Sequence, residues 1–271
     1  ISGQLLNQLN QMDGMILIVR SFLNDSVMHP SGAVDPLRDM ETMLSELLLN
    51  DLIAVERKLE RLVEERKKGS TDKVLNARQT ELFEKLHKTL SEDKHLSTME
   101  FTSEEQKELS SFGLLTRKPI LVVFNLSEGQ EEPQIKIDRP WVALMGKLEM
   151  EIAQLAPEDA AVFMEEYGIK ELSLKKMINL SYDLLQVQTF FTVGEDEVRA
   201  WETRRGANAQ ESAGEIHTDL FRGFVRAEVV AYEDLTSLGS MNEAKAKGKF
   251  RLEGKEYPVK DGDIMHVRSS L

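Results

Sequence analysis

The chain has 271 residues, of which 41% are hydrophobic and 30% are charged, and its formal net charge is -13 at pH 7. This length allows one large domain or several smaller ones, and the acidic balance disfavours nucleic acid except at a local basic face. The sequence has no cysteine, which excludes disulfides and thiolate metal sites and suits a cytoplasmic protein, and no apolar run reaches the roughly 18 residues of a membrane span.

The first part of the chain shows the pattern of a parallel α/β sheet. Residues 14–20 (GMILIVR) form a nearly continuous apolar run, which is typical of a strand buried on both faces. Residues 119–124 (PILVVF) and 141–145 (WVALM) predict two more strands, and helical patterns follow them. Segments 1–40 and 115–185 are therefore predicted to form one α/β domain.

Residues 41–114 interrupt this domain with a helical pattern. Leucine and valine recur at steps of three and four over residues 44–62, and a second leucine stripe runs over residues 75–90 after a break at Gly69. This arrangement predicts an antiparallel coiled-coil hairpin. The sequence FTSEEQKEL at 101–109 then carries a helix-capping signature. The hairpin has two open interpretations, a packing device within the domain or an arm that contacts a large partner.

The pattern changes again after residue 186. Short β-rich segments alternate with turns that contain glycine, and residues 241–249 (MNEAKAKGK) predict one short helix among them. Residues 187–271 are therefore predicted to form a small α+β domain of ordinary size.

Few residue patterns in the chain indicate catalysis. The five histidines are scattered, and none pairs with another at metal-ligand spacing. Neither GxSxG nor GxxxxGK[ST] occurs, so these residues contain no nucleophile elbow and no phosphate-cradling loop.

The stretch VVFNLSEGQ (122–130) is the strongest candidate for ligand binding. An apolar strand ends at Asn125, and ligands of doubly wound sheets bind beyond the carboxyl ends of the strands. Two interpretations of this segment are open on position alone. It reads a nucleotide base, or it is an ordinary strand-to-turn segment in which the Asn side chain bonds nearby backbone.

Two kinds of similarity favour base recognition. The strand that ends in Asn125-Leu-Ser-Glu128, followed by a strand that ends in Met145-Gly146-Lys147, resembles the Asn-Lys-x-Asp and Ser-Ala-Lys motifs of P-loop GTPases. The chain as a whole resembles the YchF family, also called Obg-like ATPases. The matching segments are GQLLNQL (3–9), MHPSGAVDPLRDMET (28–42), SSFGLLTRKPILVVFNLSE (110–128), GKLEMEIAQL (146–155), QTFFTVGEDEVRAWETRRG (188–206), AGEIHTDLFRGFVRAEVV (213–230) and RLEGKEYPVKDGDIMHV (251–267).

The resemblance implies three parts: a partial P-loop GTPase-like parallel sheet, an inserted antiparallel helical coiled coil, and a C-terminal α+β TGS (ubiquitin-like) domain. It also implies an ATPase that uses Mg²⁺, prefers ATP over GTP and associates with ribosomes. The phosphate loop, both switch regions and the Mg²⁺ ligands of the family would precede Ile1, so we expect no catalytic or metal-ligating residue within these 271 residues.

The resemblance also names base-binding residues. In Asn-Lys-x-Asp the aspartate accepts two hydrogen bonds from guanine, whereas here Glu128 is one methylene longer and Leu126 replaces the lysine. The guanine contact is therefore lost, while Leu126 can still pack on the base face, and backbone groups or Asn125 can meet the amine and ring nitrogen of adenine. The predicted base-binding residues are Asn125, Leu126, Glu128, Met145, Gly146 and Lys147.

The C-terminal domain contains a candidate surface for RNA or another partner. Arg222, Phe224 and Arg226 combine positive charge with an aromatic ring, as phosphate and base contacts require. The alternative is that Phe224 and Val225 are core strand residues. Two other functions stay open for the whole chain: a non-enzymatic ribosome- or protein-binding module, and a GTPase, which Glu128 disfavours.

Overall fold

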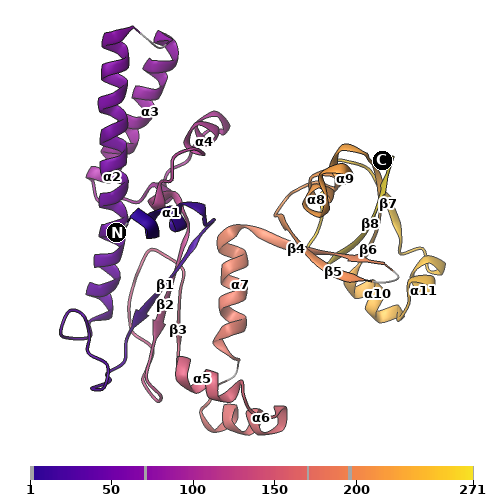
Figure 1. Cartoon of the computed structure of the whole chain (residues 1–271). Coiled ribbons are helices and arrows are strands. Elements are labelled where there is room, and N and C mark those ends of the chain that lie inside the picture. Colours follow the sequence, from indigo (N-terminus) through magenta and orange to yellow (C-terminus); the bar gives the residue numbers. More distant parts are fainter. Residues whose placement is uncertain (1–2, 70–71, 170, 195–196, 271) are drawn as a thin grey trace. The chain divides into compact units, whose positions relative to one another are not determined.

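The computed structural model describes residues 3–69, 72–169, 171–194 and 197–270, and contacts divide the chain into two compact units, 1–184 and 185–271 (Figure 1). The first unit contains a parallel sheet of three strands in the order β1-β2-β3. Their bounds are β1 (Met15–Arg20), β2 (Ile120–Asn125) and β3 (Trp141–Leu144). This sheet confirms the predicted partial parallel sheet.

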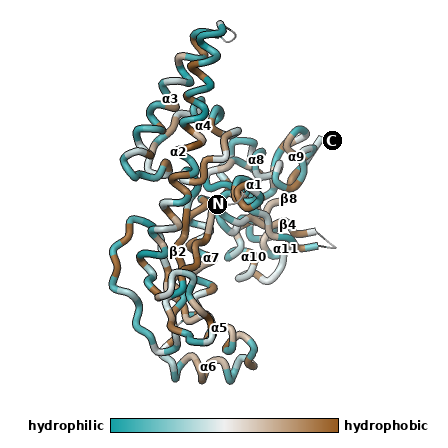
Figure 2. The backbone as a smooth tube through the Cα atoms, turned by 60° about the vertical axis from the view of Figure 1, so that its left-hand side comes forward, coloured by the Kyte–Doolittle hydropathy of each residue, from teal (hydrophilic) through white to brown (hydrophobic). Residues whose placement is uncertain are grey.

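Strand β2 is the centre of the first unit. Its residues from Ile120 to Phe124 are at most 4% exposed, and the strand is strongly hydrophobic in Figure 2. It pairs with β1 along its whole length, so that Arg20 lies opposite Asn125. Asn125 in turn lies opposite Leu144 of β3. The carboxyl ends of all three strands therefore meet at one edge of the sheet.

The prediction that β1 is buried on both faces is wrong for the described structure. Ile16 and Ile18 are 48% and 65% exposed. The pairing register puts them on the same face as Leu121 and Val123 of β2. Helix α7 (Ser173–Leu185) packs over β2 and β3 on that face but leaves β1 uncovered. An apolar run does not tell whether a strand lies inside the covered part of a sheet or at its edge.

Helices α2 (Pro36–Lys68) and α3 (Lys73–Ser91) form the expected hairpin (Figure 1). The leucine stripes face one another and pack around Phe83, which is fully buried. The second stripe differs from the prediction at its start, because Leu75 is 44% exposed. Asn76 is buried in its place and donates a hydrogen bond of 3.0 Å to the carbonyl oxygen of Leu62.

The hairpin is fastened to the sheet by a buried carboxylate. Asp51 of α2 is fully buried. Its side chain accepts hydrogen bonds from the N–H groups of Leu115 at 2.9 Å and Thr116 at 2.7 Å, and from the Thr116 hydroxyl at 2.7 Å. Those residues begin the short helix η2 (Leu115–Arg117), which leads directly into β2.

Shorter helices complete the first unit. The capping signature at 101–109 is confirmed, because Thr102 and Glu105 form a capping box at the start of one of them. The other short elements are α1 (Gly3–Gln11), η1 (Leu96–Thr98), α4 (Ser103–Leu109), α5 (Gly146–Ile152) and α6 (Pro157–Glu166). None of the helices in the described ranges combines the length and apolarity that a membrane-spanning helix requires.

The second unit is a mixed five-stranded sheet in the order β5-β4-β8-β6-β7. Apolar clusters lie on both of its faces, and helices supply residues to each. The sequence predicted one helix here, and the structure adds three that it missed. The elements are β4 (Val187–Val193), β5 (Val198–Arg204), α8 (Ala209–Ile216), α9 (Thr218–Arg222), β6 (Phe224–Ala231), α10 (Tyr232–Leu238), α11 (Met241–Ala246), β7 (Arg251–Glu253) and β8 (Asp263–Ser269).

Candidate functional site

A cavity of about 290 Å³ lies at the carboxyl edge of the parallel sheet. This volume is near the lower end of the range for small-molecule sites. Three segments line the cavity, and each follows the carboxyl end of one strand. They are residues 22–24 after β1, residues 125–128 after β2, and Met145, Lys147, Leu148 and Glu151 after β3.

Asn125 is held in a defined orientation at this edge. Its Oδ1 accepts a hydrogen bond of 3.1 Å from the N–H of Gly146, and its carbonyl oxygen accepts one of 2.8 Å from the N–H of Ser21. With Oδ1 engaged, the Nδ2 group keeps two N–H donors for another partner. A Cβ atom at Gly146 would lie 2.9 Å from Asn125 Oδ1, so glycine permits this close approach.

The other residues of the predicted base-reading motif differ in accessibility. Leu126 lines the cavity but is only 6% exposed and packs in the apolar cluster below the sheet edge, so little of its side chain can reach a base. Glu128 is exposed and also lines the cavity. Its carboxylate interacts with the phenol of Tyr167, and this hydrogen bond and charge raise the pKa of Tyr167.

The residues after β3 form a further part of the cavity wall. Met145 is partly buried, whereas the Lys147 side chain is 87% exposed and its Nζ lies 3.9 Å from Glu151 Oε1. An exposed pair of this kind contributes little to stability. The structure therefore brings all six predicted base-binding residues to one edge of the sheet, although Gly146 acts through Asn125 rather than by lining the cavity.

Sequence reasoning missed the segment after β1. Phe22 lines the cavity, and Arg20 holds this segment by donating to the carbonyl oxygens of Phe22 at 3.0 Å and Val27 at 2.9 Å. The Arg20 guanidinium also lies 4.9 Å from the centre of the Phe22 ring. The signal was present in the sequence, because the carboxyl end of any strand parallel to β2 and next to it reaches the same edge of the sheet.

The turn after Asn125 is closed by Gln130. The Gln130 N–H donates to the Ser127 carbonyl oxygen at 3.2 Å, and the Gln130 Oε1 accepts from the Ser127 N–H at 3.0 Å. Gln130 Nε2 also donates to the carbonyl oxygen of Ser21 at 2.8 Å. Gly129, with φ of 69°, supplies the left-handed conformation that this tight turn requires.

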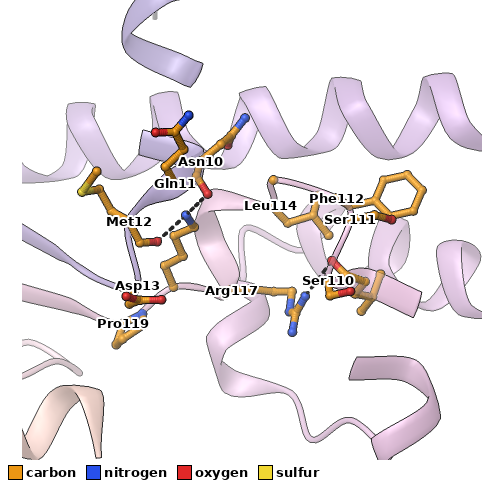
Figure 3. A pocket seen from close by; sticks show the side chains of 13 residues that line it. Asn10, Gln11, Met12, Asp13, Ser110, Ser111, Phe112, Leu114, Arg117 and Pro119 are labelled. Carbon is orange, nitrogen blue, oxygen red and sulfur yellow. Dashed lines mark hydrogen bonds between the residues drawn. The ribbon is translucent and has the colours of Figure 1, made fainter. Parts of the chain in front are cut away.

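A second cavity, of about 470 Å³, lies at the opposite edge of the same unit, between residues 10–13 and 109–114 (Figure 3). Lys118 Nζ donates to the carbonyl oxygens of Leu9 at 2.6 Å, Asn10 at 2.8 Å and Met12 at 2.5 Å. The neighbouring Arg117 donates to the Leu109 carbonyl oxygen at 3.1 Å. Both cations therefore serve the carboxyl ends of helices α1 and α4, and the cavity follows from this packing.

The described residues offer no metal centre, since they contain no group of three or more His, Cys, Asp or Glu side chains arranged to hold an ion. Mg²⁺ is the cofactor that the family resemblance implies. The described residues supply no set of ligands for it.

In the second unit, the structure separates the residues of the predicted RNA or partner surface. Phe224 is 3% exposed and packs in the core, as the alternative interpretation held, whereas its neighbour Val225 is 53% exposed. Arg222 and Arg226 are exposed. Arg226 lies directly opposite Arg268 in the pairing of β6 with β8, which gives this sheet two adjacent guanidinium groups.

Comparisons with known proteins agree over the whole chain. Residues 187–270 match the family model YchF-GTPase_C, described as "Protein of unknown function (DUF933)". "Ribosome-binding ATPase YchF" of Bacillus subtilis is 42% identical over 284 residues, a match that covers 100% of this chain and 77% of that protein. "Obg-like ATPase 1" of Oryza sativa subsp. japonica is 36% identical over 284 residues, covering 100% of this chain and 71% of that protein.

A solved structure gives the same result for the fold. The structure of the Schizosaccharomyces pombe YchF GTPase matches with a TM-score of 0.84 at 28% identity, covering 98% of this chain and 75% of that one. The likeness extends through the partial parallel sheet, the helical hairpin and the C-terminal TGS-like sheet. With sequence and fold in agreement from end to end, the chain belongs to the YchF family of Obg-like ATPases.

Proposed function

We propose that this protein binds ATP in preference to GTP at the carboxyl edge of its parallel sheet and acts as a ribosome-associated ATPase. The names of the relatives, ribosome-binding ATPase and Obg-like ATPase, support the class of activity. The observation that carries the base preference is the Asn125 amide held by Gly146 at 3.1 Å, beside a glutamate at position 128.

The preference for adenine follows from donors and acceptors. An Nδ2 donor of Asn125 suits N1 of adenine, which is an acceptor, whereas N1 of guanine carries a hydrogen and cannot accept; N3 and N7 accept in both bases. Guanine requires a carboxylate that accepts from its ring N–H and its exocyclic amine together. Glu128 is one methylene longer than the aspartate of guanine-binding sites, and Tyr167 engages its carboxylate. A guanine in this cavity would leave polar groups unmatched, which is how sites discriminate strongly between similar ligands.

Hydrolysis itself needs groups that these residues do not contain. Phosphoryl transfer depends on a phosphate loop, a metal ion and a positioned water, and the printed sequence has no GxxxxGK[ST] motif. We therefore propose that the residues around Asn125 bind and orient the base. We propose Mg²⁺ dependence from the class of reaction alone.

The test compares the binding of ATP and GTP by a polypeptide that carries a phosphate loop together with these residues. We expect ATP to bind more tightly, and Glu128→Asp combined with Leu126→Lys to move the ATP-to-GTP ratio toward GTP by at least tenfold, about 1.4 kcal/mol. Thermal unfolding accompanies each measurement because Leu126 is buried. Glu131→Asp, an exposed change on the same loop, is the matched control. An unchanged ratio in the folded double variant would refute base reading.

The main alternative is a binding module that meets the ribosome without using nucleotide. Arg226 and Arg268 support an RNA contact in the second unit, because two adjacent guanidinium groups present the clustered positive charge that phosphate binding depends on. Glu228 pairs with Arg268 and neutralises part of this charge. Sedimentation with ribosomes of a polypeptide that carries a phosphate loop together with these residues, with and without ATP, separates the two functions, since binding that ATP leaves unchanged favours the module. Arg226→Gln should weaken the salt-sensitive part of that binding.

A further inference from the structure

Gln130 occupies a central position in the hydrogen bonding of the base-reading turn. Its side chain bridges two segments, accepting from the Ser127 N–H at 3.0 Å and donating to the Ser21 carbonyl oxygen at 2.8 Å. Its backbone N–H closes the turn from the other side, at 3.2 Å from the Ser127 carbonyl oxygen. Both ends of the amide are thus used, and their roles are set by the partners, an N–H and a carbonyl oxygen.

These bonds act on Glu128, although Gln130 does not line the cavity. Glu128 lies between Ser127 and Gly129, so its backbone is fixed once the turn is closed. The bond to Ser21 fastens the closed turn to the end of β1, and Ser21 itself donates to the Asn125 carbonyl oxygen at 2.8 Å. Gln130 therefore connects the segments that present Phe22, Asn125 and Glu128 to the cavity.

Gln130 is also poorly placed to serve only global stability. It is exposed, and the loop that follows it, residues 131–140, has no helix or strand. Substitutions of exposed residues usually change stability little. The positions of binding groups, in contrast, matter within roughly 0.5 Å, and hydrogen bonds from a supporting residue are a common means of fixing them.

We propose that Gln130 is a positioning residue that holds Glu128 in register with Asn125 and thereby sets the preference for adenine over guanine. This inference rests on the proposed base reading at the same cavity. The acceptor half of the Gln130 amide adds a side-chain bond across the turn to the backbone bond that closes it, and the donor half fastens the turn to β1. Each half therefore has a separable effect.

The experiment uses the 271-residue chain labelled with ¹⁵N, with adenosine and guanosine as probes, so that no phosphate contact is needed. The variants are Gln130→Ala, which removes both halves of the amide, and Gln130→Glu, which keeps the acceptor and loses the donor. Gln134→Ala is the matched control, because Gln134 is exposed on the same loop. Nucleoside affinities come from chemical-shift titration, and turn closure comes from amide hydrogen exchange at Ser127.

In Gln130→Ala, we expect Ser127 exchange to rise at least tenfold, while the Leu126 amide, bonded to the Leu144 carbonyl oxygen at 2.8 Å, stays protected. The adenosine-to-guanosine affinity ratio should fall at least threefold. Gln130→Glu should keep Ser127 protected and still lose selectivity, and Gln134→Ala should match the unmodified chain.

Three results would contradict the inference, each in a different way. If Ser127 exchange rises in Gln130→Ala but the nucleoside ratio is unchanged, Gln130 closes the turn without positioning Glu128, and the base reading stands. If the unmodified chain shows no preference for adenosine, the base reading fails and the inference fails with it. A Gln130→Glu variant with unaltered selectivity would remove the role assigned to the Ser21 bond.

Discussion

Replacing Asp51 by alanine should detach the helical hairpin from the entry to β2. Asp51 is fully buried, and its carboxylate accepts from two backbone N–H groups and one hydroxyl. In Asp51→Ala the N–H groups of Leu115 and Thr116 would stay buried without an acceptor. The Thr116 hydroxyl would lose its acceptor in the same variant.

The magnitude follows from these groups. Each buried donor that loses its partner costs about 1–3 kcal/mol. Burial raises the pKa of Asp51, which means that ionising this carboxyl in the folded state already offsets part of the hydrogen-bond energy. We therefore expect Asp51→Ala to lower the free energy of unfolding of the first unit by about 3 kcal/mol. Thr116→Val, which removes only the hydroxyl, should cost about 1 kcal/mol.

The two tryptophans make the assay specific to each unit. Trp141 lies on β3 in the first unit and Trp201 on β5 in the second. Denaturant unfolding followed by fluorescence in Trp201→Phe and Trp141→Phe backgrounds reports each unit separately. Asp51→Ala should shift the Trp141 transition and leave the Trp201 transition in place. Glu60→Ala, an exposed acidic change on the same helix, is the control.

A small effect would refute the reasoning. If Asp51→Ala changes the Trp141 transition by no more than Glu60→Ala does, the carboxylate does not fasten the hairpin. Equal shifts of both transitions would mean that the change acts on the whole chain rather than at η2.

Three further changes test other parts of the structure. Burial lowers the pKa of His95 from 6.5 to about 4, so as the pH falls the unfolded chain takes up this proton before the folded chain does, and the free energy of unfolding should fall by ~3 kcal/mol between those pH values. In His95→Gln this dependence of the unfolding free energy on pH should be absent. An identical dependence in the variant would contradict the assignment to His95. Gly146→Ala should displace the Asn125 amide, because the new Cβ atom would lie 2.9 Å from Asn125 Oδ1. We expect adenosine affinity to fall at least fivefold without a comparable loss of stability. A titration that shows unaltered affinity would argue against Asn125 as a base contact. Tyr257→Phe removes a 2.8 Å hydrogen bond to the buried Asp263, and we expect a loss of about 1–2 kcal/mol in the Trp201 transition alone.

The sequence predicted most of the regular elements because their signals are local. The leucine spacing of the hairpin and the capping box at Thr102 each depend on residues within a few turns of one another. The same kind of signal was present and missed before α8, where Asn208 and Glu211 form a second capping box. Local signals failed at Leu75, where the helix pattern continues but the partner helix does not cover it.

The candidate site was predictable only in part. Asn125 was found because an apolar strand ends there, and Glu128 because it stands at a fixed distance from it along the chain. Phe22 and Gln130 were not found. Phe22 reaches the cavity through the pairing of β1 with β2, which brings together residues separated by about a hundred positions. Gln130 lies outside the motif and acts through Ser21, again across that pairing.

By itself, the sequence determined the membership of the family, the partial α/β sheet and the inserted hairpin, since each is carried by periodicity or by a contiguous motif, and it supplied the segment at Asn125 as a candidate for base binding. Only the tertiary structure decided how these parts act together. Helix α7 covers β2 and β3 but leaves Ile16 and Ile18 of β1 exposed. The apolar cluster of the first unit buries Leu126, and the alignment of β1 with β2 brings Ser21 to Gln130. Exposure and hydrogen-bond partners are properties of a packed arrangement, and a residue's neighbours along the chain do not specify which distant segment will cover it.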